Sequence, residues 1–234
     1  MSGDSLSARM LGVARAPRAT FERLAANPRW ADVLVATLLV TALSSALLLE
    51  TDTGRLALLD QWERTALAFG QPVDDLQYSV LERASADGAA YAIVSSFAVG
   101  PLLAFALSAT LFGMFRVQTR GDVRFRQVLA IVAHAGVILM LRQVIATPVA
   151  YMRETLASPM TFGLFFTMPD ETSPLARFAG FVDLFVLWWI VVLAVGISVL
   201  YRTPAPRLAL AFLGMYVALA GVLTIAMALT GRTA

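Results

Sequence analysis

Five long apolar stretches, separated by short polar segments, make up most of this 234-residue chain. They lie near residues 31–49, 89–115, 128–151, 178–201 and 208–229. Each has about 19–27 residues, and a helix of roughly 20 residues crosses the hydrocarbon core of a bilayer. These stretches are apolar on all sides, which favours membrane spans over the helices of a soluble core. We therefore predict an all-α integral membrane protein built as a bundle of five transmembrane helices.

The polar segments around the spans also have helical patterns. Residues 1–30 are expected to form short amphipathic helices broken at Pro17, with Phe21 and Leu24 on one side of the second helix. Such a helix is expected to lie on a surface of anionic headgroups. The alternative is that residues 1–30 form a solvated tail. The bundle is expected to fold without residues 1–26. The loop 50–88 is expected to form external helices that cover the five-helix domain 31–229; a substrate lid is the alternative.

Charge is distributed unevenly between the predicted sides of the membrane. Segments 1–32, 116–127 and 202–207 hold 11 arginines against 4 acidic residues, whereas the other loops and the C-terminal tail hold 6 against 11. Positively charged loops stay in the cytoplasm, so we predict a cytoplasmic N-terminus and an external C-terminus. All the basic residues are arginine, which favours a bacterial source and hence the inner membrane. The predicted lipid-facing basic surface comprises Arg15, Arg18, Arg23, Arg120, Arg124 and Arg126.

The few polar residues inside the predicted spans define an intramembrane candidate site. Arg142 and Asp183 are the only charges well inside spans, and a lone central charge costs roughly 2.5–3.5 kcal/mol. In straight helices their depths differ by about 6 Å, which an arginine side chain can cover. The two residues could form a substrate or proton site. The alternatives are a structural ion pair, or an Arg142 side chain that extends outward to the membrane surface. His134, Gln143 and Pro101 complete the predicted site.

Two of these residues have further interpretations. His134 suits a proton relay or a hydrogen-bonded packing position. Pro101 follows Gly100 in a span with small residues at every fourth position, which allows close approach of a neighbouring helix. A helix broken at Gly100–Pro101 can form a binding site, while a structural kink is the plainer interpretation.

Enzyme chemistry has little support in the sequence. The chain has no cysteine and one histidine, which excludes thiolate nucleophiles and multi-histidine metal sites. It lacks a G-x-S-x-G motif and the glycine-rich loops that bind nucleotide phosphates. We therefore expect no enzymatic activity, no cofactor and no metal, and we expect anionic lipid rather than nucleic acid as the partner of the cytoplasmic arginines.

Three stretches carry a resemblance to a known family. The first is the entry to the first span, with Pro17, Phe21, Pro28 and Trp30. The second, FRQVLAIVAHAG, follows the basic loop. The third runs from SPMTFGLFF into the fourth span, where a D-x-F-x-x-W…G pattern is formed by Asp183, Phe185, Trp188 and Gly196. These stretches resemble the Yip (Ypt-interacting protein) domain family, particularly its bacterial members.

The resemblance implies a five-helix bundle with a cytoplasmic N-terminus and supplies no catalytic residues. Eukaryotic relatives bind small Rab-type GTPases in vesicle trafficking, but the short N-terminal segment here carries no feature for that role. We expect a non-enzymatic inner-membrane protein that acts in membrane organisation, lipid handling or contact with other membrane proteins or a second copy. The alternative is a small-solute or ion permease with its site at Arg142, Asp183 and the Gly100–Pro101 break.

Overall fold

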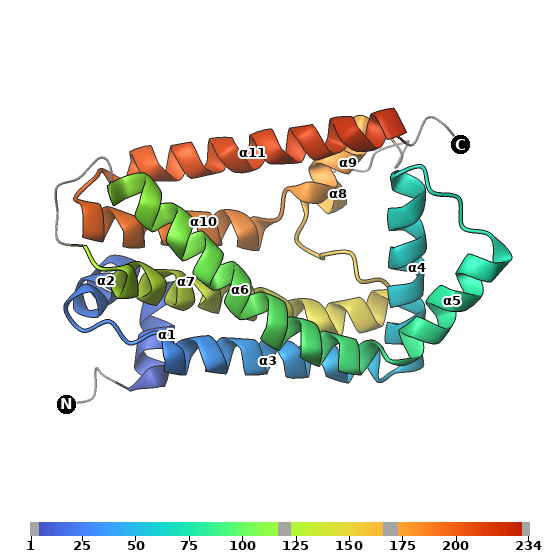
Figure 1. Ribbon diagram of the computed structural model, residues 1–234, viewed down its shortest axis with the longest axis horizontal. Helices are drawn as coiled ribbons and strands as arrows, with labels where there is room; N and C mark the ends of the chain where they lie inside the picture. Colours follow the sequence, from blue (N-terminus) through green and yellow to red (C-terminus); the bar gives the residue numbers. More distant parts are fainter. Residues whose placement is uncertain (1–4, 117–122, 166–172, 231–234) are drawn as a thin grey trace. The chain divides into compact units, whose positions relative to one another are not determined.

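A computed structural model of the chain is almost entirely helical over the residues that it describes, which are 5–116, 123–165 and 173–230 (Figure 1). Within these ranges, five helices are long and apolar enough to cross a membrane: α3 (Ala31–Leu49), α6 (Gly88–Arg116), α7 (Phe125–Arg153), α10 (Leu184–Tyr201) and α11 (Ala205–Thr230). The described ranges contain no β-strand apart from one isolated bridge between Thr161 and Asp183. The predicted fold class, an all-α five-span membrane bundle, is confirmed.

The chain divides into two compact units. The first unit comprises Met1–Thr41, Ser95–Arg142 and Phe185–Gly214, and the second comprises Ala42–Val94, Gln143–Leu184 and Met215–Ala234. By sequence, the first unit contains twelve arginines and four acidic residues, and the second contains six arginines and twelve acidic residues. All three arginine-rich segments that were predicted to share one side of the membrane therefore belong to one unit.

The core of the first unit joins α3 and α7. Val33 and Leu34 of α3 pack with three buried residues of α7, which are Ala133, Val137 and Met140. Leu6 and Met10 of α1 (Leu6–Arg15) pack against the same cluster. The first amphipathic helix is therefore part of the unit's core and does not stand apart from it.

The second N-terminal helix, α2 (Pro17–Ala26), begins at the predicted break and is also packed against protein. Proline suits the first turn of a helix, where its missing N–H has no partner to lose. Phe21 and Leu24 are buried, and a Cβ atom added to Gly196 of α10 would lie 3.2 Å from the Phe21 ring. The apolar side of α2 therefore faces α10 and not lipid. This burial argues against the expectation that the bundle folds without residues 1–26, because their removal would uncover this core.

In the second unit, α4 (Asp52–Ala68) and α5 (Asp75–Ala86) form the loop that was predicted to be helical. Figure 1 shows α4 running crosswise to α3, which precedes it. Leu58 of α4 packs with Leu49 and Ala92 of the adjoining spans, and the Thr230 hydroxyl at the end of α11 donates to the Ala68 carbonyl at 3.4 Å. These contacts support the covering role predicted for the loop.

Helix α6 runs through Pro101 without interruption, so the alternative of a helix broken at Gly100–Pro101 is wrong. A Cβ atom on Gly100 would overlap the Leu38 side chain of α3. The Ser108 hydroxyl, fully buried, donates to the Ala104 carbonyl of its own helix at 2.6 Å. The small residues of α6 thus allow close helix packing within the chain, as their spacing predicts.

The predicted fourth span, residues 178–201, is instead two helices. The short α9 (Pro174–Phe181) ends before Val182, and α10 begins at Leu184. Between them the backbone is extended and pairs with the segment that leads into α8 (Phe162–Phe165). The Phe162 N–H donates to the Val182 carbonyl at 2.9 Å, and the Leu184 N–H donates to the Met160 carbonyl at 3.0 Å. This pairing provides partners for backbone groups that a continuous helix would satisfy internally.

Candidate functional site

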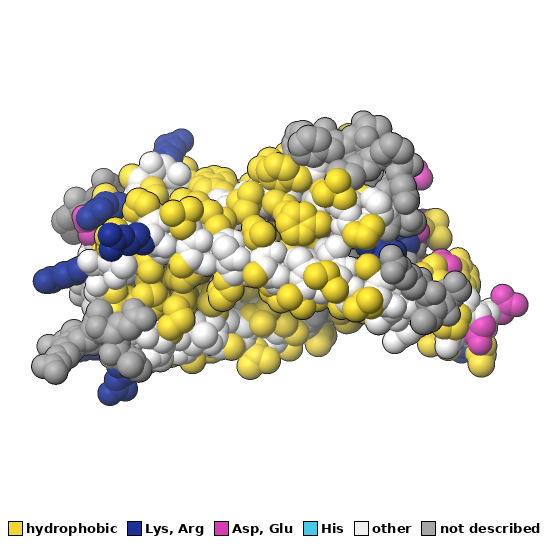
Figure 2. Space-filling model, turned by 90° about the horizontal axis from the view of Figure 1, so that it is seen from above, with side chains coloured by type: hydrophobic (Ala, Val, Ile, Leu, Met, Phe, Trp, Pro, Cys, Tyr) yellow, Lys and Arg dark blue, Asp and Glu magenta, His cyan; other side chains and the backbone are white. Residues whose placement is uncertain are grey.

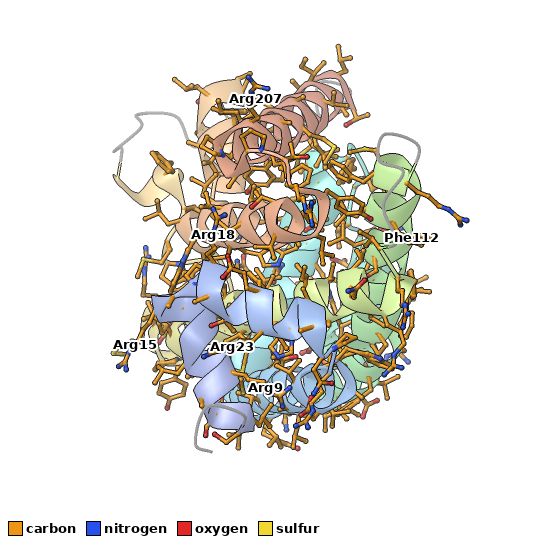
Figure 3. The ribbon with its side chains drawn as sticks, turned by 90° about the vertical axis from the view of Figure 1, so that its left-hand side faces the viewer. Arg9, Arg15, Arg18, Arg23, Phe112 and Arg207 are labelled. Atoms are coloured by element: carbon orange, nitrogen blue, oxygen red, sulfur yellow. The ribbon has the colours of Figure 1, made fainter. Side chains whose placement is uncertain are left out.

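Exposed arginines gather on the first unit and form what we call the basic face. Its described members come from α1, α2, the end of α6, the start of α7 and the turn between α10 and α11: Arg15, Arg18, Arg23, Arg116, Arg124, Arg126, Arg202 and Arg207. Figure 2 shows basic side chains that project from the surface, and Figure 3 labels Arg15 of α1, Arg18 and Arg23 of α2 and Arg207 of α11. Arg120, which the sequence placed on the same surface, lies outside the described residues.

The fold holds α2 against the start of α7 through one glutamine. The Gln127 side-chain Nε2 donates to the Ala25 carbonyl at 2.7 Å, and its Oε1 accepts the Arg124 N–H at 2.8 Å. With Phe21 and Leu24 turned inward, the arginines of α2 point away from the core. The amphipathic pattern read from the sequence is therefore correct, although the partner of its apolar side is protein.

Two contacts modify the charge of the basic face. Arg18 Nε lies 3.1 Å from Glu22 Oε1, one turn along α2, and both side chains are exposed. Such surface pairs contribute little free energy, so Arg18 remains available to a stronger anion. The Arg116 guanidinium lies 5.6 Å from the ring centroid of Phe112, a cation–π distance. The face is therefore only slightly neutralised by its own neighbours.

Arg9 differs from the other N-terminal arginines because it is buried, with 4% of its surface exposed. Its Nη2 forms an ion pair with the Asp32 carboxylate of α3, whose other oxygen accepts the Val33 N–H at 2.9 Å. Arg9 Nε and Nη1 have no hydrogen-bond partner in the part of the chain that the structure describes. Sequence reasoning missed this residue, although Arg9 lies between Leu6, Met10 and Val13 on the apolar face of α1.

His134 lies fully buried in α7 of the same unit. Its Nδ1 is 2.8 Å from the Ala130 carbonyl one turn earlier, and a carbonyl can only accept, so the proton sits on Nδ1. Nε2 has no partner within the described ranges. Of the two interpretations offered by the sequence, this bond to its own helix favours the packing position.

Asp183, in the second unit, lies in the extended link between α9 and α10 and is 3% exposed. The Ser158 hydroxyl donates to its carboxylate, and its own N–H lies 3.5 Å from the Tyr216 hydroxyl of α11. That hydroxyl in turn donates to the Phe181 carbonyl. The aspartate therefore helps to fix the point at which α9 ends and α10 begins.

The other predicted intramembrane residues have more modest surroundings. Arg142, Gln143 and Pro101 are half-buried. Gln143 Nε2 lies 3.4 Å from the Thr147 hydroxyl, which itself donates to the Gln143 carbonyl at 2.8 Å. Pairing of Arg142 with Asp183 stays a prediction. Among the residues described, no group of three histidine or acidic side chains is placed to hold a metal ion.

These features define a multi-pass integral membrane protein with an arginine-rich surface at one compact unit. Its family follows from comparison with known proteins. The Yip1 domain matches residues 11–227, nearly the whole chain, and the protein therefore belongs to the Yip1 domain family. No curated protein and no solved structure matches the chain.

Proposed function

We propose that this protein acts without catalysis, as a membrane organiser that holds anionic lipid headgroups against its basic face. The observation that carries the proposal is the arrangement of α2, whose Phe21 and Leu24 are buried while Arg18 and Arg23 are exposed. An amphipathic helix normally inserts its apolar side into the interface. Because that side is occupied here, lipid contact is left to the arginines, each contributing about 1 kcal/mol near an anionic surface.

The proposed location is the bacterial inner membrane, with the basic face on the cytoplasmic leaflet. Support comes from the charge of the two units, since the first contains a threefold excess of arginine over acidic residues. Basic segments are retained on the cytoplasmic side during insertion, and the anionic lipids of that leaflet complement them. On this proposal, topology and lipid recognition depend on the same arginines.

The permease alternative has less support. It needs a broken α6, but that helix is continuous, and Gly100 is explained by the close approach of Leu38. Asp183 has local partners in Ser158 and the adjoining backbone. These contacts give packing roles to two parts of the suggested permease site, whereas the basic face has no comparable structural explanation.

The proposal is tested with full-length protein reconstituted in mixed vesicles of phosphatidylcholine and phosphatidylglycerol. Spin-labelled lipid reports the fraction of each lipid that the protein immobilises. We expect a preference for phosphatidylglycerol that falls when Arg15, Arg18 and Arg23 are changed to Gln. The same three residues changed to Lys should keep most of the preference, because the positive charge near the headgroups is retained.

A matched control changes three exposed arginines of the second unit, Arg64, Arg83 and Arg153, to Gln. This variant has the same net charge as the first but an intact basic face, so it should keep the lipid preference. Equal losses in both glutamine variants would show that only net charge matters. An unchanged preference in the Arg15, Arg18 and Arg23 variant would contradict the proposal.

A further inference from the structure

Helix α5 in the second unit exposes large apolar side chains although it is not a membrane span. Leu76 is 71% exposed and Val80 is 51% exposed. Residues four apart lie on the same side of a helix, so these two form one apolar strip. Ser85 is the buried residue of α5, and it lies on a different side of the helix together with the half-buried Leu81, four residues earlier. The strip therefore points away from the side of α5 that is packed.

Acidic side chains flank this strip. Asp75, Glu82 and Asp87 are exposed, and none of them forms an ion pair within the described part of the chain. The only arginine of α5, Arg83, donates to the Ser79 carbonyl of its own helix at 3.0 Å. Figure 2 shows acidic side chains beside hydrophobic ones in the region of α5, which Figure 1 labels. The surface therefore combines an apolar strip with unneutralised negative charge.

The charge of this surface discriminates between four possible occupants: hydrocarbon, lipid headgroups, a second copy of α5 and a helix of another protein. Hydrocarbon is excluded by the cost of burying unpaired carboxylates, and anionic headgroups are repelled by them. A second copy of α5 would place like charges opposite each other, which is destabilising across an interface. A basic amphipathic helix satisfies both features, because its apolar residues cover Leu76 and Val80 and its cations meet the acidic flank.

We propose that α5 is a docking surface for a basic, amphipathic helical segment of another protein on the side of the membrane that holds loop 50–88. The contact is formed by Leu76 and Val80, with Asp75, Glu82 and Asp87 as the charged flank. It is independent of the lipid contact proposed for the basic face, because it uses residues of the other unit.

The test uses full-length protein in nanodiscs of phosphatidylcholine, a lipid without net charge, so that the bilayer exerts no net electrostatic attraction on a cationic peptide. The probe is a fluorescent peptide of about 15 residues, with leucine every three or four positions and arginine elsewhere. Binding is followed by fluorescence anisotropy, with empty nanodiscs as background. A peptide with the same leucines and glutamate in place of arginine is expected not to bind.

Two variants separate the two parts of the surface. Changing Leu76 and Val80 to Ser, or Asp75, Glu82 and Asp87 to their amides, should each weaken binding about tenfold, as loss of several exposed contacts predicts. Both sets are exposed, so the fold is expected to survive, which an unchanged elution volume would verify. Matched controls outside α5 should bind as the unchanged protein does: Leu11→Ser for the apolar change, and amides of Asp52, Glu63 and Glu154 for the acidic change.

Three results would overturn the inference. The first is equal binding of the basic and acidic peptides, which would show that charge has no role. The second is unchanged affinity in the α5 variants. The third is a change in oligomeric state on replacing Leu76 and Val80, which would identify a second copy as the occupant. None of these results bears on the lipid preference of the basic face, so each proposal can fail alone.

Discussion

At Gly196, α10 lies close to both α7 and α2, and replacement of this glycine by Ala gives a sharp test of the packing. A Cβ atom there would overlap Ile131 Cγ2 and lie 3.2 Å from two ring carbons of Phe21. Both neighbours are fully buried, and the β-branched Ile131 has little rotamer freedom in a helix. The added methyl group therefore cannot be accommodated by a simple side-chain rotation.

We expect Gly196→Ala to lower the free energy of unfolding by about 1–3 kcal/mol, the usual cost of overpacking a core. The matched control is Gly214→Ala in α11, where no atom lies within 4 Å of the added Cβ. That control should be neutral or slightly stabilising, because alanine favours helix by up to about 1 kcal/mol over glycine. Both are measured by unfolding purified protein in mixed micelles with a rising fraction of denaturing detergent.

A second substitution tests the cause. Ile131→Ala removes the overlapping methyl group, so the double variant with Gly196→Ala should lose less stability than the sum of the two single changes. Strictly additive losses would show that Ile131 is not the obstacle. If Gly196→Ala is as stable as Gly214→Ala, the close contact between α10, α7 and α2 is wrong, and so is the inward orientation of Phe21.

Three further predictions concern buried polar groups and topology. Asp32→Asn should destabilise the protein by about 1–3 kcal/mol in the same unfolding assay, because Arg9 loses its counter-charge. The control Glu22→Gln, at the exposed pair with Arg18, should cost under about 0.5 kcal/mol. Equal losses would contradict the burial of Arg9. Ser158→Ala should cost about 1–3 kcal/mol by removing a donor from the buried Asp183, with the exposed Ser7→Ala as control, and an unaffected stability would remove the structural role of that bond. Because the chain has no cysteine, single cysteines can be introduced and labelled without background. In intact cells, cysteines at positions Ser2 and Arg120 should resist an impermeant thiol reagent, whereas those at Asp75 and Thr233 should react. The opposite labelling would show that the topology is reversed.

Much of the fold could be predicted because membrane spans have a strong signal of length and apolarity. The start of α2 at Pro17 was also predictable, since proline fixes the backbone locally. The break before α10 was missed because it depends on pairing with residues 158–162, which are distant in sequence. Asp183 offered a local signal, because aspartate is common immediately before the first residue of a helix. An apolar run on both sides of the residue concealed that boundary.

The candidate sites were less predictable than the spans. Sequence reasoning placed Arg15, Arg18 and Arg23 on an exposed surface, and the structure agrees on their exposure. It could not show whether lipid or protein covers Phe21, because the bilayer core and the protein interior are both apolar. It also assigned no partner to Arg9, because the ion pair between Arg9 and Asp32 depends on how α1 folds back onto α3. Helix periodicity identifies the side that is buried but not the element that buries it.

The buried N-terminal helices have a consequence for biogenesis. They leave the ribosome before the spans do, yet Leu6 and Met10 pack against a cluster of α3 and α7 residues, and Phe21 lies beside Gly196 of α10. Until α7 and α10 have been synthesised and inserted, the apolar sides of α1 and α2 lack part of the protein that covers them. Helices α1 and α2 are thus among the last parts to reach their final contacts, and we expect a fusion or deletion there to affect a late step of assembly.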